Sequence, residues 1–169
     1  IVTTTGYTLE PLSGLGGSIG FLIFVLAFIG ACSGSVGGGM KVWRILLMLK
    51  VGFSNITKII HPSAINSVKL NGEKIVSSQI EAVFSFIAIC ISFFLLFMLV
   101  LIFQNVDFYS AFSGTAAAIN NLGPGLGSFS ENYSALSDVG KFTLTMAMIV
   151  GRLELFGVLI LFVPSFWRS

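Results

Sequence analysis

The stretch that decides the fold is AVFSFIAICISFFLLFMLVLIF, which runs from Ala82 to Phe103 and contains no charged residue. As an α-helix it would be about 33 Å long, enough to cross a hydrocarbon core of about 30 Å. The composition agrees, because 55% of the 169 residues are hydrophobic and 9% are charged, whereas soluble domains carry about 25% charged residues. The sequence therefore predicts an all-α membrane protein.

Two further apolar stretches flank this span. One extends from about Val139 to Val163 and is interrupted by Lys141, Arg152 and Glu154. The other extends from Gly16 to Lys50 and would be longer than about 50 Å as a single helix. Because that length exceeds one straight crossing, we expect this stretch to break, tilt or leave the membrane.

The placement of charge predicts the orientation of the spans. Six basic residues and one acid lie between Lys41 and Lys74, whereas three acids and no base lie between Asp107 and Asp138. The positive-inside rule then places residues 41–77 in the cytoplasm and 105–138 outside. The net charge of +2 is too small to indicate a nucleic-acid partner.

A shorter segment, DFYSAFSGTAAAIN from Asp107 to Asn120, has the pattern of a helix with Asp107 as its N-cap. At about 18 Å it is too short to cross a membrane, so we expect either a surface helix or a re-entrant one. The following NLGPGLG contains three glycines and a proline and is not expected to stay helical.

Two short loops in the chain look alike. TTTGYT (residues 3–8) and INNLGPG (residues 119–125) are polar runs that reach a glycine and precede a span running inward. TTTGYT also resembles the TVGYG filter signature of potassium channels. Taken alone, such a string is equally typical of an extracellular turn.

The chemistry of a filter explains this pattern. A potassium ion gives up its water only where carbonyl or hydroxyl oxygens replace it, and glycine lets successive carbonyls face one axis. A short helix whose C-terminus points at the site adds partial negative charge. The candidate ion-binding residues are Thr3, Thr4, Thr5, Gly6 and Tyr7 in one loop, and Asn120, Asn121, Leu122, Gly123 and Pro124 in the other.

The glycine-rich stretch GACSGSVGGGMK, from Gly30 to Lys41, follows the first apolar run. Each glycine costs a helix about 1 kcal/mol relative to alanine, so the segment is not expected to be helical throughout. It is either a helix end with glycine C-caps or a deliberate break inside the membrane. A third possibility, close packing through the Gly30–Gly34 pair, also stays open.

Arg152 is a charge that needs an explanation. It lies about 16 Å along the helix from Lys141 and so near the middle of the bilayer, where contact with lipid would cost about 2.5–3.5 kcal/mol. We expect it to face protein, either as a donor to carbonyls of the glycine stretch or in a structural ion pair.

In this order, GACSGSVGGGMK, HPSAINSVKLNG, AAAINNLGPGLG, VGRLELF and PSFWR resemble the Trk/Ktr family of potassium transport proteins. The resemblance covers essentially the whole chain and corresponds to the family's carboxy-terminal half. It implies helix–pore-helix–filter-loop–helix repeats of a potassium-channel-like pore, with about one and a half of four repeats present. Residues 1–50 would be the third-repeat filter loop and broken inner helix, 51–77 a cytoplasmic linker, and 78–169 the complete fourth repeat.

The resemblance also implies a function and partners. The function is potassium uptake by a multi-pass protein of the inner membrane, with the potassium ion as transported ligand and no cofactor. The partners are the amino-terminal half of the same pore, a second copy in a homodimer, a cytoplasmic nucleotide-binding regulatory ring of the TrkA/KtrA kind, and membrane lipid. The implied gate is the glycine stretch with Arg152, namely Gly30, Ser33, Gly34, Ser35, Gly37, Gly38, Gly39 and Arg152.

Two other functions compete with a pore. One is a non-conducting membrane scaffold or anchor subunit whose glycines only permit close packing, and the other is an inverted-repeat secondary transporter with broken helices. No Ser/His/Asp, paired-carboxylate or Cys/His pattern indicates an enzyme or a metal site. The chain opens without Met, so we expect it to be part of a longer protein.

Overall fold

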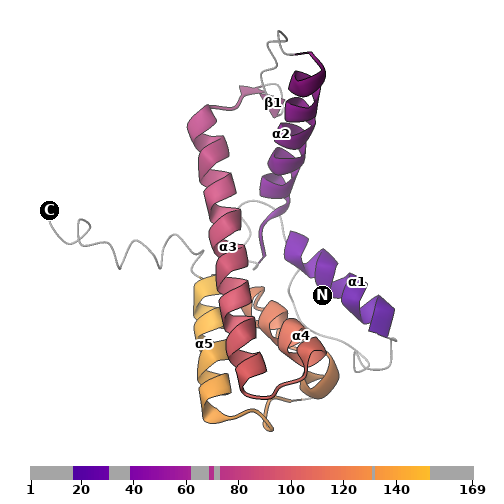
Figure 1. Cartoon of the computed structure of the whole chain (residues 1–169), viewed down its shortest axis with the longest axis vertical. Helices are drawn as coiled ribbons and strands as arrows, with labels where there is room; N and C mark the ends of the chain where they lie inside the picture. Colours follow the sequence, from indigo (N-terminus) through magenta and orange to yellow (C-terminus); the bar gives the residue numbers. More distant parts are fainter. Residues whose placement is uncertain (1–16, 31–38, 62–68, 71–72, 131, 153–169) are drawn as a thin grey trace, which may run out of the picture.

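The computed structural model describes residues 17–30, 39–61, 69–70, 73–130 and 132–152 (Figure 1). The long helix α3 forms the axis of the molecule, with α2 along one half and α4 and α5 along the other (Figure 1). The elements are α1 (Gly17–Ile29), α2 (Val42–Ile60), β1 (Lys69–Leu70), β2 (Glu73–Lys74), α3 (Ser77–Phe103), α4 (Phe108–Ile119), the 3-10 helix η2 (Gly127–Phe129) and α5 (Asp138–Arg152).

Helix α3 confirms the predicted span and begins five residues earlier, at Ser77. Among the described residues it is the one helix that is long and apolar enough to cross a membrane. Apolar side chains cover its whole circumference: Phe97 and Leu101 are buried against the other helices, while Leu95 and Leu99 are exposed. A helix that is apolar on every face suits a span with protein on one side and lipid on the other.

The stretch from Gly16 to Lys50 breaks, as expected. Helix α1 ends at Ile29 and α2 begins at Val42. Helix α2 then continues to Ile60, so the domain boundary expected at Lys50 falls inside a helix. The helix ends directly before His61-Pro62, because a residue that precedes proline disfavours the α conformation.

In the described part of the chain, the short antiparallel pair β1–β2 is the one β-sheet. Each strand has two residues, and Lys69 pairs with Lys74. The pair lies in the segment expected as a linker, between α2 and α3, and does not alter the helical architecture.

Helix α4 occupies the centre of the packed half of the molecule. It contacts α1, α3, α5 and η2, and its consecutive residues from Ser113 to Ile119 are all buried. These side chains are mostly small, which lets neighbouring helices approach on every side. Two aromatic contacts link α3 and α1 to this helix, namely Phe94 with Phe112 and Phe21 with Phe112, and a third, Phe28 with Phe94, links α1 to α3.

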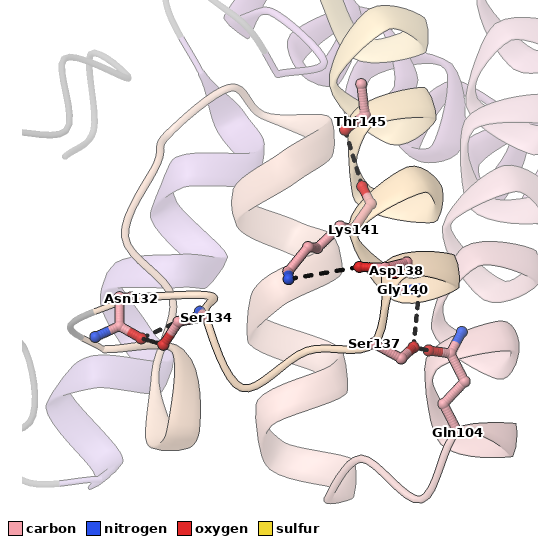
Figure 2. A network of polar contacts seen from close by, with 8 residues as sticks. All are labelled: Gln104, Asn132, Ser134, Ser137, Asp138, Gly140, Lys141 and Thr145. Carbon is pink, nitrogen blue, oxygen red and sulfur yellow. Dashed lines mark hydrogen bonds and ion pairs between the residues drawn. The ribbon is translucent and has the colours of Figure 1, made fainter.

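A polar network ties the C-cap residue of α3 to the start of α5 (Figure 2). The Ser137 hydroxyl accepts a hydrogen bond from the Gly140 amide at 3.2 Å, which makes Ser137 the N-cap of α5. The same hydroxyl donates to the side-chain carbonyl of Gln104, the C-cap residue of α3. Hydrogen bonds of side chains therefore join α3 and α5 at this end.

Candidate functional site

The candidate filter loop follows α4, and the sequence sets where this helix begins. The Asp107 carboxylate accepts hydrogen bonds from the amides of Tyr109 and Ser110 at 3.1 and 3.2 Å. The predicted N-cap is confirmed. Helix α4 therefore has 12 residues and lies buried between longer helices. This arrangement corresponds to the re-entrant helix of the two predicted alternatives, not to the surface helix.

The end of α4 is a Schellman motif centred on the two asparagines. The Leu122 amide donates to the Ala117 carbonyl at 2.8 Å, and the Asn121 amide donates to Ala118 at 3.0 Å. Asn121 adopts the left-handed conformation, with φ of 53°, that this motif requires. The motif explains why a helix of good formers stops here, and it directs the chain into the loop at the negative end of the helix dipole.

The side chains of the two asparagines lie at this helix end. The Asn120 amide nitrogen donates to the Ala116 carbonyl at 2.9 Å, and the side chain is 1% exposed. Among the described residues, Asn120 Oδ1 and Asn121 Nδ2 have no hydrogen-bond partner, and neither does Thr115 Oγ1 one turn earlier. Since buried polar groups are normally paired, these atoms mark α4's end as a place where further polar contacts are needed.

Gly123 is the turning point of the loop. Its φ of +98° lies where residues with a Cβ are strained. The residue is exposed, and a Cβ built on it would meet no atom within 4 Å. Backbone conformation, not space, is therefore what requires glycine here.

The Gly123 carbonyl accepts a hydrogen bond from the Tyr133 hydroxyl at 2.9 Å. Burial raises the pKa of Tyr133 to about 12, so the phenol stays protonated and remains a donor at physiological pH. A carbonyl oxygen has two lone pairs, and this bond leaves one of them available.

Two serines of α4 hold the chain as it returns from the loop. The Ser113 hydroxyl accepts a hydrogen bond from the Leu126 amide at 3.0 Å. The Ser110 hydroxyl accepts one from the Ser128 amide, also at 3.0 Å. Loop and helix are thus joined by side chain to backbone bonds on one face of α4.

Helix α5 approaches the other side of the α4 terminus. A Cβ built on Gly151 would lie 1.9 Å from the carbonyl oxygen of Ile119, the last residue of α4. A Cβ atom at that distance would clash with the carbonyl, so this position requires glycine. The next residue, Arg152, ends the described part of α5 with an exposed side chain.

The described ends of the candidate gate are in contact with each other. A Cβ built on Gly39 would lie 2.9 Å from the Cα of Gly30, and the Met40 amide donates to the Phe28 carbonyl at 3.0 Å. Gly30 and Gly39 have φ of 68° and 88°. These contacts form a closed neck, defined by residues 28, 30, 39 and 40, at which α1 and the chain leading to α2 lie side by side.

Helix α2 is anchored to α3 one turn beyond this neck. The Arg44 guanidinium lies 4.0 Å from the ring centroid of Phe86 and 5.5 Å from that of Trp43. Cation–π contacts of this kind strengthen where water is excluded. The start of α2 is therefore fixed relative to α3.

The described residues contain one of the two candidate loops. Asn120, Asn121, Leu122, Gly123 and Pro124 lie together at the end of α4. Gly30 and Gly39 meet at the neck, and Arg152 follows the glycine that touches α4. The remaining candidates lie outside the described residues: Thr3, Thr4, Thr5, Gly6, Tyr7, Ser33, Gly34, Ser35, Gly37 and Gly38.

Several residues that shape the site were not singled out by sequence reasoning. Tyr133, Ser110, Ser113 and Gly151 all contact the loop or the end of α4. Small residues at positions 110, 113 and 114 of a short helix were an available signal for close backbone approach. The contact of Tyr133 with Gly123, ten residues earlier in the chain, had no such signal.

Comparisons with known proteins point to one family. The family described as "TrkH: Cation transport protein" matches residues 1–169. The Trk system potassium uptake protein TrkH of Halomonas elongata is 43% identical over 169 residues, which are 100% of this chain and 35% of the relative. The same-named protein of Escherichia coli K12 is 40% identical with the same coverage.

A solved structure agrees with the arrangement of the helices. The crystal structure of the potassium transporter TrkH from Vibrio parahaemolyticus matches with a TM-score of 0.89 at 40% identity, covering 99% of this chain and 36% of that chain. The likeness confirms the predicted pore-repeat fold. The chain spans about a third of the length of the curated relatives it matches.

Proposed function

Because the chain belongs to the TrkH family of cation transport proteins, we propose that the complete protein takes up potassium ions across the inner membrane of the cell. It is a membrane protein, not an enzyme, and the chain supplies about one and a half of its four pore repeats. The relatives named as potassium uptake proteins support the choice of ion.

The observation that carries this proposal is the end of α4. A short, buried helix stops at a Schellman motif, and four residues later the chain has passed through a left-handed glycine with an exposed backbone. The negative end of the helix dipole and a turn at a conformationally free glycine therefore lie at the same place. A site where backbone oxygens replace the water around an ion requires this combination. The filter in our proposal consists of residues 120–124 and residues 3–7, with the missing repeats completing the ring.

The gate in our proposal is the glycine stretch together with Arg152. The closed neck at Gly30 and Gly39 supports it, because the two ends of the glycine stretch lie against each other. Movement of the glycine stretch between these two residues would then open or close the pore without displacing α1 from α2. Regulation by a nucleotide-binding cytoplasmic ring and assembly as a homodimer are part of the same proposal.

Ion flux into proteoliposomes tests the proposal. The full-length protein is reconstituted, and uptake of K⁺, Rb⁺ and Na⁺ is measured at equal gradients. A potassium pore gives K⁺ uptake that exceeds Na⁺ uptake and needs no second ion gradient. A scaffold gives no flux, and an inverted-repeat transporter gives flux only with a coupling ion, so either result would reject the pore.

A further inference from the structure

We propose that Tyr133 is a positioning residue of the filter: its hydroxyl fixes the direction of the Gly123 carbonyl and thereby the ion selectivity of the loop. The inference rests on the proposed function of residues 120–124 as a filter. It assigns a role to a residue ten positions away, in the segment that leads to α5.

The Gly123–Pro124 peptide group has no amide hydrogen, so a hydrogen bond can hold it only at its carbonyl oxygen. The ring of Pro124 narrows the range of the preceding residue, and glycine still moves within that range at low cost. The Gly123 residue is exposed, and the space where a side chain would lie is open. Among the described residues, the hydrogen bond from Tyr133, at 2.9 Å, is therefore the one that restrains the direction of this carbonyl.

Tyr133 can act as a restraint because its own ring is held. The ring stacks on Phe129 with centroids 4.9 Å apart and planes inclined by 23°. The Phe129 ring in turn lies on α4, where a Cβ built on Gly114 would be 2.7 Å from Cδ2 of the ring. Rigid rings thus connect the middle of the pore helix to the carbonyl at the turn.

The loop is also closed on itself beneath the tyrosine. The Gly125 amide donates to the Phe129 carbonyl at 3.1 Å. A Cβ built on Gly125 would lie 2.8 Å from Phe129 Cβ and 3.1 Å from the Tyr133 hydroxyl oxygen. The hydroxyl is therefore seated between Gly123 and Gly125, and a shift of the ring would move the loop with it.

A second role must be distinguished from this one. Tyr133 could simply stabilise the outer turn, in which case its removal would lower stability and leave the discrimination between ions unchanged. A restraint on the carbonyl predicts the opposite pattern, because loss of the hydroxyl changes the direction of the Gly123 carbonyl while the packing of the ring persists. The ratio of K⁺ to Na⁺ permeability separates the two, since the amount of folded protein cancels in a ratio.

The main experiment substitutes Tyr133→Phe in the full-length protein, which removes the hydroxyl and keeps the stacked ring. We expect the K⁺/Na⁺ permeability ratio to fall about two- to tenfold, the range that loss of one hydrogen bond gives in an equilibrium constant. Tyr109→Phe is the matched control, because it removes a phenol hydroxyl from the first turn of α4, away from Gly123. An unchanged ratio in Y133F would overturn the inference.

A second variant keeps the test decisive if Y133F does not fold. Incorporation of 4-aminophenylalanine at position 133 retains the ring and an N–H donor at the same place. We expect this variant to keep the ratio of the unmodified protein, and a folded protein with a reduced ratio would contradict the inference. If the unmodified protein itself showed no preference for K⁺, the proposed function would fail first, whatever the variants do.

Discussion

Gly151 of α5 lies directly against the carbonyl group of Ile119, where a Cβ on the glycine would be 1.9 Å from the oxygen. This contact joins the last inner helix to the last residue of the pore helix. The position of the proposed filter loop, which begins one residue later, therefore depends on how closely α5 approaches α4. Three substitutions of glycine and one titration follow from the structure.

The first prediction concerns this contact. Gly151→Ala puts a methyl group where the Ile119 carbonyl lies, so α4 and α5 must separate. Overpacking of a tight contact costs about 1–3 kcal/mol, and we expect at least that loss of stability together with reduced K⁺ flux. Thermal unfolding in detergent and flux in proteoliposomes measure the two effects.

The matched control is Gly52→Ala in α2. Gly52 also lies within a helix, and a Cβ built there meets no atom within 4 Å. Alanine at an open helical position is expected to raise stability by about 1 kcal/mol or less. If Gly151→Ala raised stability as Gly52→Ala is expected to do, the result would contradict the close approach of α5 to α4.

The second prediction concerns the turning point of the filter. Gly123→Ser introduces no clash, because the surrounding space is open, but it disfavours the left-handed backbone. An L-residue costs about 1–2 kcal/mol in that region, so the K⁺/Na⁺ permeability ratio is expected to fall by up to about 30-fold. Reversal potentials or paired flux assays give this ratio, and a value equal to that of the unmodified protein would count against the filter assignment.

The third prediction concerns the neck of the candidate gate. Gly39→Ala places a Cβ 2.9 Å from the Cα of Gly30, at a residue with φ of +88°. The neck must widen, and we expect higher K⁺ flux in the absence of the regulatory ring. Flux that is unchanged or lower, from protein of normal stability, would favour the reading of this stretch as a simple helix end.

The fourth prediction concerns pH. Burial raises the pKa of Tyr133 to about 12, whereas an unfolded tyrosine has a pKa of about 10. The protonated form is therefore favoured by folding, so its contribution is complete below pH about 10 and is lost as pH rises from about 10 to 12. The difference in Tm between the unmodified protein and Tyr133→Phe should be constant below pH about 9 and should change above pH about 10. A constant difference throughout would show that the phenol is not buried.

Much of the fold could be predicted because its signals are local. A charge-free run long enough to span gave α3, and Asp107 before a run of helix-forming residues gave the start of α4. Breaks followed from the glycine-rich stretch that begins at Gly30 and from the loop that contains Gly123. These features depend on residues that are neighbours in the chain.

The contacts that position the proposed filter could not be predicted, because they join residues that are not neighbours in the chain. Tyr133 reaches Gly123 across a loop with no periodicity, so no spacing rule places its hydroxyl there. The pairing of Gly151 with Ile119 depends on the angle between two helices, which the sequence of neither helix specifies. The domain boundary at Lys50 was placed from the family resemblance and from the end of an apolar run, and neither of these ends a helix.

The most direct test of the central claim is to locate the ion. Crystals of the full-length protein grown with Rb⁺ or Tl⁺ in place of K⁺ give anomalous difference density at bound ions. The account predicts a peak surrounded by oxygen atoms that include backbone carbonyls of residues 120–124, and its loss when the ion is replaced by Na⁺. Density confined to other parts of the protein, with these carbonyls facing away from it, would contradict the account.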